Sequence, residues 1–502
     1  MLNFSRYLPA LIVSAGLLPS AWLLYRFPDT PQLGMAGDDV MYMGVAQSLA
    51  DGQGYREAAL PGNPWQTKYP PVYPVMLAAI LKASPMARDF WIIAHSWLWL
   101  AAASVALAWA MVQAGFSAVQ GAVVAALWTA NPAASSVGTV ALSDAPYCAV
   151  LFLAVGCALN SCALNNGRTA TRMAVLAGAL AGVASTIRIS GLVACAAICA
   201  WLLWSKRVRA AVWFFGAGIV PPAIWVVWAR AHLPLSHDVI TTFYFDYGER
   251  WLQTVRAVGL GTLIIKNLPY VLTVLGGLVI ASKTLVFLRA IRDLILMAFV
   301  ASAVTEWGGG PFTLITVTTA AFHLGWNWPP NERFLLAASP ALLGALVVKL
   351  SSQPATIQIA ALAMVAIADA YGIANLSDIY IAQRGRLAAL APAYSFIETE
   401  IPRNAIILGD ERIWLHARRQ AIGMPLPKEY QYLDRMKSAT DGFYLHYGAV
   451  ARQFGASYML VTPWDLSESM SEDQERYYAV VRSDPGLTRV FSSNGVELFR
   501  VR

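Results

Sequence analysis

Long apolar stretches, separated by short polar connections, recur along the chain from residue 7 to about residue 375. Many of them reach the roughly 20 residues that an α-helix needs to cross the hydrocarbon core of a bilayer. The first stretch is expected to remain as an uncleaved transmembrane helix, because we find no convincing small-x-small cleavage motif after it. The expected spans are residues 7–27, 89–113, 118–131, 145–163, 173–187, 190–204, 210–229, 310–326, 334–350 and 355–374.

The segment 260–306 is also apolar, but Lys283, Arg289 and Arg292 interrupt it. This segment either crosses the membrane once and adds an interfacial helix, or crosses it three times. Both arrangements keep the predicted orientation of the rest of the chain. The total is therefore about 11 to 13 transmembrane helices. We find no internal repeat, which disfavours a transporter, since many transporter folds are built from duplicated halves.

Short connections rich in Lys and Arg set the orientation, because such connections stay on the cytoplasmic side of the membrane. Placing them inside leaves the loop 28–88, the segment around Asp144, the loop 231–259 and the C-terminal region outside. The basic residues that set this orientation are Arg168, Arg172, Lys206, Arg207, Arg209 and Lys349.

The composition changes from about residue 376, where charged residues and prolines return together with strand-like runs. Residues 405–409 and 458–462 have the pattern of buried strands, and residues 488–491 and 496–499 flank a hairpin turn. We therefore expect a transmembrane domain over residues 1–375 and an extracytoplasmic soluble α/β domain over residues 376–502. The second domain is long enough to hold a core of its own.

Composition agrees with a polytopic α-helical membrane protein. Of the 502 residues 57% are hydrophobic and only 13% are charged, with mean hydropathy +0.52, whereas soluble domains carry about 25% charged residues. The net charge of +7 is spread thinly; it fits the positive-inside rule and anionic lipid and predicts no nucleic-acid partner. The five cysteines lie in or beside apolar segments, so we expect packing residues without disulfides.

Two adjacent acids, Asp38 and Asp39, open a short helix directly after the first span, and Tyr42 follows one turn later. One acid would be enough to cap a helix and to complement its dipole. The pair leaves two interpretations open: helix capping, or a carboxylate that takes a proton from an acceptor hydroxyl.

Lys68 precedes Tyr69 and the diproline Pro70-Pro71 at the other end of the same loop. The diproline cannot continue a helix, so it fixes an extended entry into the next apolar segment. A solvated lysine and an ammonium held rigidly at the level of a lipid phosphate both fit this position.

Three further charged residues fall on the expected outer side. Asp144, followed by Pro146, begins the span 145–163 and is either a helix cap or a functional acid. Arg188 lies between two apolar spans and Arg333 begins another. An outer arginine needs a partner, which is either an acid in a structural ion pair or a bound phosphate.

The loop 231–259 is rich in aromatic and polar residues, among them His237, Asp238 and Tyr247. It fits either an amphipathic helix lying on the membrane or a loop that covers a substrate. His237 and Asp238 alone are too short a motif to predict a metal site.

In these residues the chain resembles the C superfamily of glycosyltransferases (GT-C), and within it bacterial lipid A aminoarabinose transferases and protein O-mannosyltransferase-like enzymes. The resemblance covers nearly the whole chain and lies in the order and spacing of its motifs. Asp39 stands where Glu is usual, Phe334 replaces a Tyr, and Ala337 a Pro. The motifs are Asp38-Asp39 with Tyr42, Lys68-Tyr69-Pro70-Pro71, Asp144, Arg188 and Arg333-Phe334-Leu335-Leu336.

The resemblance implies an inverting sugar transfer with Asp38 as the general base. It implies that Lys68, Arg188 and Arg333 hold the phosphate of the lipid donor, while Asp39 and Asp144 orient the acceptor or the sugar. No cofactor is required, although a divalent metal between Asp38 and Asp144 would be compatible. The candidates for substrate contact are Tyr42, Tyr69, His237 and Tyr247.

The function expected from this resemblance is transfer of a sugar from a polyprenyl-phosphate carrier to a hydroxyl on the outer face of a bacterial inner membrane. The acceptor would be a glycolipid such as lipid A, a cell-envelope glycan or a protein. The soluble domain would then be periplasmic. The alternative is a transporter or flippase of a lipid-linked sugar, which would carry its donor across the membrane without cleaving it.

Overall fold

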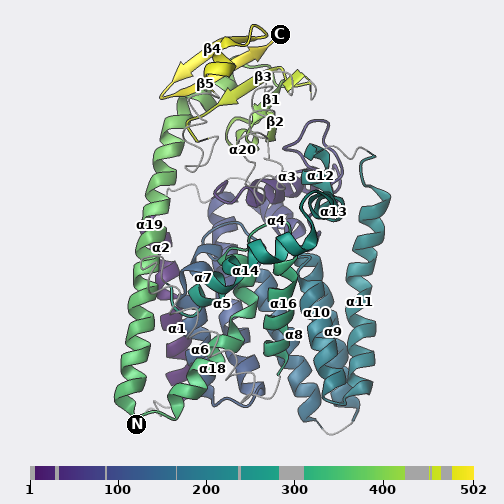
Figure 1. Ribbon diagram of the computed structural model, residues 1–502, viewed down its shortest axis with the longest axis vertical. Coiled ribbons are helices and arrows are strands. Elements are labelled where there is room, and N and C mark those ends of the chain that lie inside the picture. The colour runs from purple at the N-terminus through teal and green to yellow at the C-terminus, as the bar shows by residue number, and fades with distance from the viewer. Residues whose placement is uncertain are drawn as a thin grey trace.

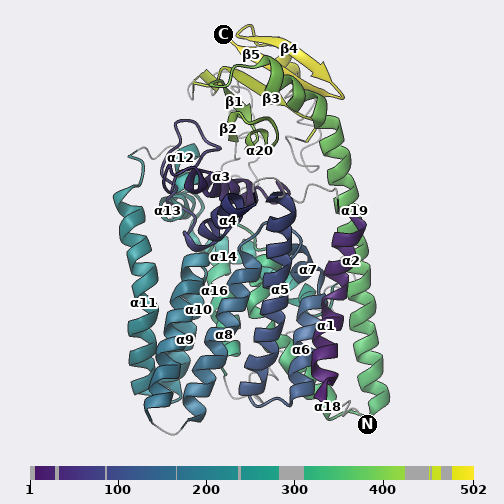
Figure 2. The same cartoon turned by 180° about the vertical axis from the view of Figure 1, so that it is seen from behind.

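The computed structural model describes residues 6–28, 33–84, 88–164, 167–235, 239–281, 310–423, 451–452, 455–464 and 478–502. In these residues a bundle of long helices stands beneath a small mixed sheet, and a layer of short helices lies between the two (Figure 1). The helix α19 (Ala355–Glu400) runs along one side of the bundle and reaches the sheet in both views (Figures 1 and 2).

Seven helices of the described chain are long and apolar enough to cross a membrane, and a pair bent by 58° adds an eighth if it is one span. A multi-pass membrane protein of apolar helices is therefore confirmed, and the predicted spans 7–27, 89–113, 145–163, 173–187, 210–229 and 355–374 fall in helices long enough to cross a membrane. The predicted spans 118–131, 190–204 and 310–326 form shorter apolar helices and 334–350 forms the bent pair, so the described residues hold seven or eight such helices against the expected 11 to 13. Residues 282–306 lie outside the described part. The seven are α1–α2 (Leu8–Gly16 and Leu18–Arg26), α5 (Arg88–Gln113), α8 (Asp144–Ala163), α9 (Arg168–Ile187), α11 (Val208–Ala231), α14 (Leu260–Gly277) and α19.

Shorter helices complete the bundle and its upper layer. The bent pair consists of α17 (Glu332–Leu335) with the 3-10 turn η3 (Leu336–Ala338), followed by α18 (Pro340–Ser351). The others in the bundle are α6 (Ala118–Ala130), α7 (Pro132–Val137), α10 (Gly191–Trp204) and α16 (Pro311–Leu324). Between the bundle and the sheet lie α3 (Asp38–Ala50), α4 (Val72–Ala83), α12 (Val239–Phe245) and α13 (Tyr247–Val258).

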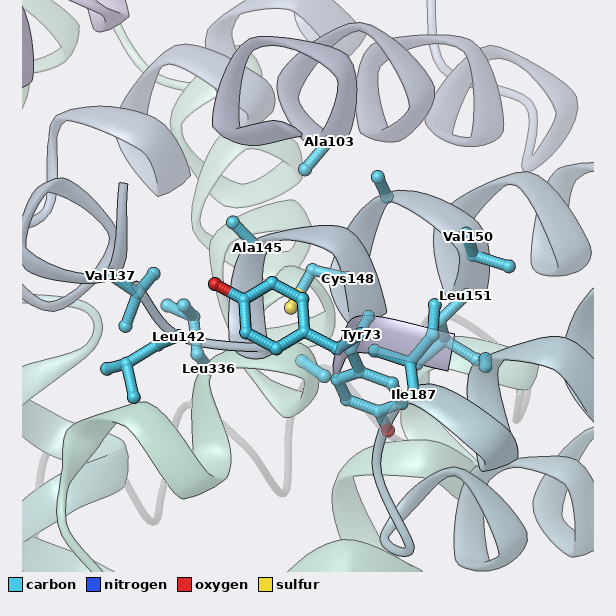
Figure 3. Packing of buried hydrophobic residues seen from close by; sticks show 14 of the residues in the cluster. Tyr73, Ala103, Val137, Leu142, Ala145, Cys148, Val150, Leu151, Ile187 and Leu336 are labelled. Atoms are coloured by element: carbon cyan, nitrogen blue, oxygen red, sulfur yellow. The ribbon is translucent and has the colours of Figure 1, made fainter. Parts of the chain in front are cut away.

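The bundle is organised around α8, in which 78% of an 18-residue apolar window is buried. Side chains of α8, together with Ile187 and Leu336, gather around Tyr73 of α4 (Figure 3). Small residues allow the helices to approach closely, as in many membrane bundles. A Cβ at Gly178 of α9 would lie 2.1 Å from the carbonyl oxygen of Phe214 on α11, so only glycine fits there.

The cysteines agree with the expected packing role: all five are free, and Cys148, Cys157 and Cys195 are buried in the bundle. The connections that carry most of the basic residues lie at the end of the bundle away from the sheet (Figures 1 and 2). The start of α8 and the short helices α3, α4, α12 and α13 lie at the sheet end. The segments that the predicted orientation placed on the outer side, namely the loop after the first span, the start of α8 and the loop 231–259, thus share one end of the bundle.

Helix α19 is longer than the predicted span 355–374, because it continues to Glu400. The apolar composition ends near residue 376, but the residues that follow still form a helix. Ala393 and Ile397 of this extension are buried against the sheet domain. The change in composition therefore marks where the apolar surface ends, while packing on the sheet decides where the helix ends.

The sheet has the strand order β2-β1-β3-β5-β4. Its parallel part is β2 (Gln420–Gly423), β1 (Ile406–Gly409) and β3 (Tyr458–Val461), with α20 (Arg412–Ala417) between β1 and β2. The predicted hairpin is confirmed as antiparallel β4 (Leu487–Ser493) and β5 (Val496–Val501). Its turn residues Asn494 and Gly495 both have positive φ, as a two-residue hairpin requires. Strand β2 was not predicted, because Gln420–Gly423 has only one β-branched residue and lacks the continuous apolar run of β1 and β3.

Candidate active site

Asp38 begins α3 and accepts two strong hydrogen bonds through its carboxylate. Its Oδ1 accepts from the Tyr69 hydroxyl at 2.8 Å, and its Oδ2 accepts from Arg333 Nη2 at 2.5 Å. Burial by itself raises the pKa of Asp38, but Arg333, Lys68 and these hydrogen bonds outweigh it and hold the pKa below 3.8. The side chain keeps 25% of its surface exposed. Asp38 is thus an ionised carboxylate that a substrate can still reach.

A second acid–arginine pair begins α8. Arg188 Nη1 donates to Asp144 Oδ2 at 2.7 Å and also contacts Ser143 Oγ at 3.3 Å. The Tyr42 hydroxyl shares a hydrogen bond of 2.9 Å with the same Ser143 oxygen. Asp144 is the first residue of the helix rather than its cap. The pair is therefore connected through Ser143 to the helix that carries Asp38.

Phe334 lies between the two arginines. Its ring centroid is 5.7 Å from Arg188 Cζ and 4.9 Å from Arg333 Cζ, within the range of cation–π contact. His323 stacks on the same ring at 5.8 Å. Phe334 therefore supports both guanidinium groups side by side, a role that needs only the ring and not the hydroxyl of a tyrosine.

Lys68 is 7% exposed and lies close enough to Asp38 to lower the pKa of that carboxyl. Its ammonium donates to the carbonyl oxygen of Phe243 at 2.8 Å. The centroids of the Tyr69, Phe243 and Tyr247 rings lie 5.1, 4.5 and 4.6 Å from Nζ. Burial lowers the pKa of Lys68 to about 8, although Asp38 and Glu411 act in the opposite direction. This lysine is thus enclosed by rings of α12 and α13 rather than solvated.

The predicted substrate-contact tyrosines belong to one aromatic cluster. The Tyr69 ring lies 5.0 Å from Tyr42 and 6.3 Å from Tyr247 in edge-on contacts. Tyr247 also contacts Trp326 at 5.7 Å. The loop 231–259 therefore covers the Lys68 end of the site through α12 and α13. His237 lies outside the described residues.

Asp39 points to the backbone before the helix and not to the partners of Asp38. It is fully buried, and its Oδ2 accepts from the Gly34 amide at 2.6 Å. Burial raises the pKa of Asp39 to about 6, with the Gly34 hydrogen bond opposing it. Its contacts fix the segment 33–37 that leads into α3. Asp39 thus affects the site by holding the backbone of this segment in place.

A mostly apolar cavity of about 680 Å³ opens beside Arg333. The segment before α3 and the helices α7, α14 and α19 form its walls. We refer to it as the lateral cavity. It is lined by Met35, Val137, Leu142, Arg333, Leu376 and Ile379, among other residues. Arg333 Nη1 is buried without a hydrogen-bond partner among the described residues, so this guanidinium keeps one donor unused.

The carboxylates do not form a metal site with the residues that the structure describes. No group of three His, Cys, Asp or Glu side chains comes together in that part of the chain. Asp38 and Asp144 are each paired with an arginine instead. A divalent cation prefers several oxygen ligands, and this donor set does not fit one. We assign no step to a metal.

Neither a protein-family model nor a curated protein matches this sequence. Solved structures do match. ArnT from Cupriavidus metallidurans bound to undecaprenyl phosphate has a TM-score of 0.58 and 12% identity over 98% of this chain and 97% of that chain. The archaeal oligosaccharyltransferase AglB from Archaeoglobus fulgidus, in complex with an inhibitory peptide and a dolichol-phosphate, has a TM-score of 0.58 and 11% identity over 100% and 75%. The chain has the GT-C fold.

The GT-C fold extends over both parts of the molecule, because the likeness covers nearly all of this chain. A further structure of the Archaeoglobus fulgidus oligosaccharyltransferase, tethered with an acceptor peptide, has a TM-score of 0.60 and 12% identity over 99% and 74%. The fold expected from the order of motifs in the sequence is therefore confirmed. At this identity the likeness concerns the fold and leaves the chemistry to the residues of this chain.

Within the GT-C fold several contacts of the site had no signal in the sequence. The Tyr244 hydroxyl donates to Glu411 and accepts from the Gly423 amide at 2.9 Å, which joins α12 to the sheet domain. Tyr244 and Glu411 are 167 residues apart, and no local pattern connects them. Ser143 was within reach of prediction, since it directly precedes Asp144.

Proposed function

We propose that this protein is a glycosyltransferase that moves a sugar from a polyprenyl-phosphate carrier to a hydroxyl of an acceptor. The observation that carries the proposal is the position of Asp38 and Arg333. An ionised, accessible carboxylate lies next to a guanidinium on the wall of a mostly apolar cavity. An apolar cavity with a cation at its edge suits a lipid tail and its phosphate.

Arg333 can serve the donor and the base at the same time. Its Nη2 holds Asp38, while Nη1, which has no hydrogen-bond partner in the part of the chain that the structure describes, is available to a phosphate oxygen. A guanidinium presents several donors in a fixed plane, so one group can bind a carboxylate and a phosphate together. Lys68, whose charge also lowers the pKa of Asp38, supplies a second cation for the same phosphate. The cations stabilise the negative charge that grows on the leaving phosphate.

The reaction is an inverting displacement at the anomeric carbon. The acceptor oxygen attacks that carbon, and the bond between the carbon and the phosphate oxygen breaks with its electron pair leaving on the phosphate. The proton of the acceptor hydroxyl passes to Asp38. When the phosphate binds Arg333, its negative charge offsets part of the positive charge of the guanidinium, so the pKa of Asp38 rises and the carboxylate becomes a better base.

Asp144 and Arg188 are assigned to substrate orientation. Asp144 Oδ1 is buried without a hydrogen-bond partner among the described residues. A hydroxyl of the sugar or of the acceptor would satisfy this oxygen, while Arg188 holds the carboxylate in place. The connection through Ser143 to Tyr42 couples this orientation to the helix of Asp38.

Two further observations support the lipid-linked donor and its side of the membrane. Neighbours of the same fold were solved with undecaprenyl phosphate and with dolichol-phosphate. The basic connections lie at the opposite end of the bundle from Asp38, which favours an outer, extracytoplasmic site in a bacterial inner membrane.

The test uses purified protein in lipid nanodiscs with a radiolabelled polyprenyl-phosphate sugar and a glycolipid acceptor. We expect release of polyprenyl phosphate and a product of inverted anomeric configuration by NMR. Asp38→Asn should lower the rate by roughly 10²- to 10⁴-fold, as the loss of a general base does. Asp51→Asn, an exposed acid at the end of the same helix, is the matched control. Passage of intact donor across the bilayer without its cleavage would favour the flippase alternative.

A further inference from the structure

A second cavity, of about 310 Å³, lies between the sheet domain, α19 and the segment that precedes α3. Gly409 at the end of β1 and Thr462 directly after β3 form part of its wall. These are the carboxyl ends of two neighbouring parallel strands. In α/β sheets such ends are the usual location of ligand sites. We refer to this space as the sheet-edge cavity.

The sheet-edge cavity is lined by charges of both signs together with aromatic rings. Asp410, Glu411 and Arg412 follow β1, and Arg386 faces the cavity from α19 with its Cζ 5.9 Å from the Trp464 ring centroid. Arg412 is already neutralised in part by Asp410 at 3.2 Å. The mixed charge does not suit a simple anion or an aliphatic chain. It suits a neutral ligand with many hydroxyl groups, because each hydroxyl both donates and accepts.

Two aromatic side chains of the cavity strengthen this assignment. Tyr394 of α19 stacks on His416 of α20 at a centroid distance of 5.0 Å. His416 Nε2 is buried without a hydrogen-bond partner among the described residues. Burial lowers the pKa of His416 to about 4, so the imidazole is neutral at pH 7. Flat rings and a neutral polar nitrogen match a sugar ring, which presents C–H groups on its faces and hydroxyls at its edge.

The position of the sheet-edge cavity relates it directly to Asp38. Gly34 and Met35 line it, and the Gly34 amide is the group that Asp39 binds. Met35 also lines the lateral cavity. The two cavities therefore both border the segment 33–37, and Asp38 follows at its end. A donor in one cavity and an acceptor in the other would approach this carboxylate from different directions, as a displacement requires.

We propose that the sheet-edge cavity binds a sugar ring of the acceptor and so selects a carbohydrate-bearing acceptor over a protein. The assignment rests on the transferase function proposed above. Its volume is near the lower limit for small-ligand pockets and matches one or two sugar rings. The sheet domain then contributes acceptor recognition, and the segment 33–37 connects the site of the bound ring to Asp38.

The experiment measures binding separately from catalysis. Asp38→Asn protein in nanodiscs is probed by saturation-transfer NMR with methyl α-mannoside, methyl β-N-acetylglucosaminide and the deacylated glucosamine disaccharide of lipid A. A threonine-containing peptide is the competing probe. We expect signals from a sugar probe and their loss in Arg386→Ala and in Trp464→Ala. Arg403→Ala, an exposed arginine that does not line the cavity, should leave the signals unchanged.

A kinetic measurement on active protein completes the test. Arg386→Ala and Trp464→Ala should raise the KM for the glycolipid acceptor about tenfold, as the loss of one charged hydrogen bond or stacking contact does, with less than a twofold change in kcat. Melting temperatures identify any variant that fails to fold. No sugar signal in the parent protein, signals from the peptide alone, or signals that persist in both folded variants overturn the proposal. If the protein binds the sugar probe but does not cleave the donor, the result contradicts the proposed transferase function and leaves the proposed sugar site standing.

Discussion

Arg333 donates to Asp38 across 295 residues of sequence and keeps its second terminal nitrogen without a partner among the described residues. The arginine therefore holds the carboxylate ionised while one donor remains free for the substrate. The resemblance in sequence implied a general base at Asp38 and phosphate binding at Arg333, in two separate motifs. This one contact joins the two motifs.

Removal of Arg333 should change the pH dependence as well as the rate. Arg333 helps to hold the pKa of Asp38 below 3.8, so Arg333→Ala should move the acidic limb of kcat/KM to higher pH. The rate should also fall by roughly 10²- to 10³-fold, because a charge-stabilising donor is lost. Steady-state rates between pH 4 and 8 measure both effects. Arg172→Ala, an exposed arginine at the opposite end of the bundle, is the control; an unshifted acidic limb in Arg333→Ala would contradict the pairing.

Activity should decline at alkaline pH as Lys68 loses its proton. Its pKa is lowered to about 8, so the charged form, which is the one that binds phosphate, is present below this pH and is lost above it. Lys68→Arg keeps the charge at all accessible pH values, so the decline of kcat/KM for the donor between pH 7 and 9.5 should disappear. The same alkaline decline in both proteins would assign it to another group.

Asp39 should prove less important for chemistry than for structure. Asp39→Asn retains an oxygen that accepts from the Gly34 amide and should lower kcat less than tenfold, in contrast to Asp38→Asn. The pKa of Asp39 is raised to about 6 in the folded protein, above the ordinary 3.8. Its contribution to stability is therefore full below pH 3.8 and lost as the pH rises through 6.

Melting temperatures of parent and Asp39→Asn protein between pH 3.5 and 7 check this assignment. The parent should lose a component of its stability over that interval, and the asparagine variant should lack this component. A loss of activity in Asp39→Asn as large as that in Asp38→Asn would instead place Asp39 in the catalytic step.

Loss of the Tyr244 hydroxyl should weaken the attachment of the sheet domain. Tyr244→Phe leaves the partly buried Glu411 without its donor and the Gly423 amide without its acceptor, which costs about 1–3 kcal/mol. We expect a lower melting temperature and faster proteolysis of the sheet domain in nanodiscs. Tyr371→Phe, on the exposed face of α19, controls for removal of a tyrosine hydroxyl. Equal stability of the two variants would show that this contact contributes nothing to docking.

Much of the architecture follows from local patterns. Apolar runs predicted the helices because a membrane span must satisfy its backbone within itself, and the hairpin turn Ser492–Gly495 placed β4 and β5. Patterns failed where packing on a distant element decides the outcome. Strand β2 exists because it pairs with β1, and α19 continues to Glu400 because its polar half packs on the sheet.

For the site, the sequence by itself determined which side chains gather at one end of the bundle, because charges are excluded from the apolar spans and positive connections orient the chain. It did not determine the pairs they form. Consecutive residues of a helix point about 100° apart, so Asp38 and Asp39 cannot share their partners. Only the tertiary structure, which brings Arg333 and Tyr69 to one side of α3 and Gly34 to the other, decided which acid pairs with the arginine and which one holds the segment beside it.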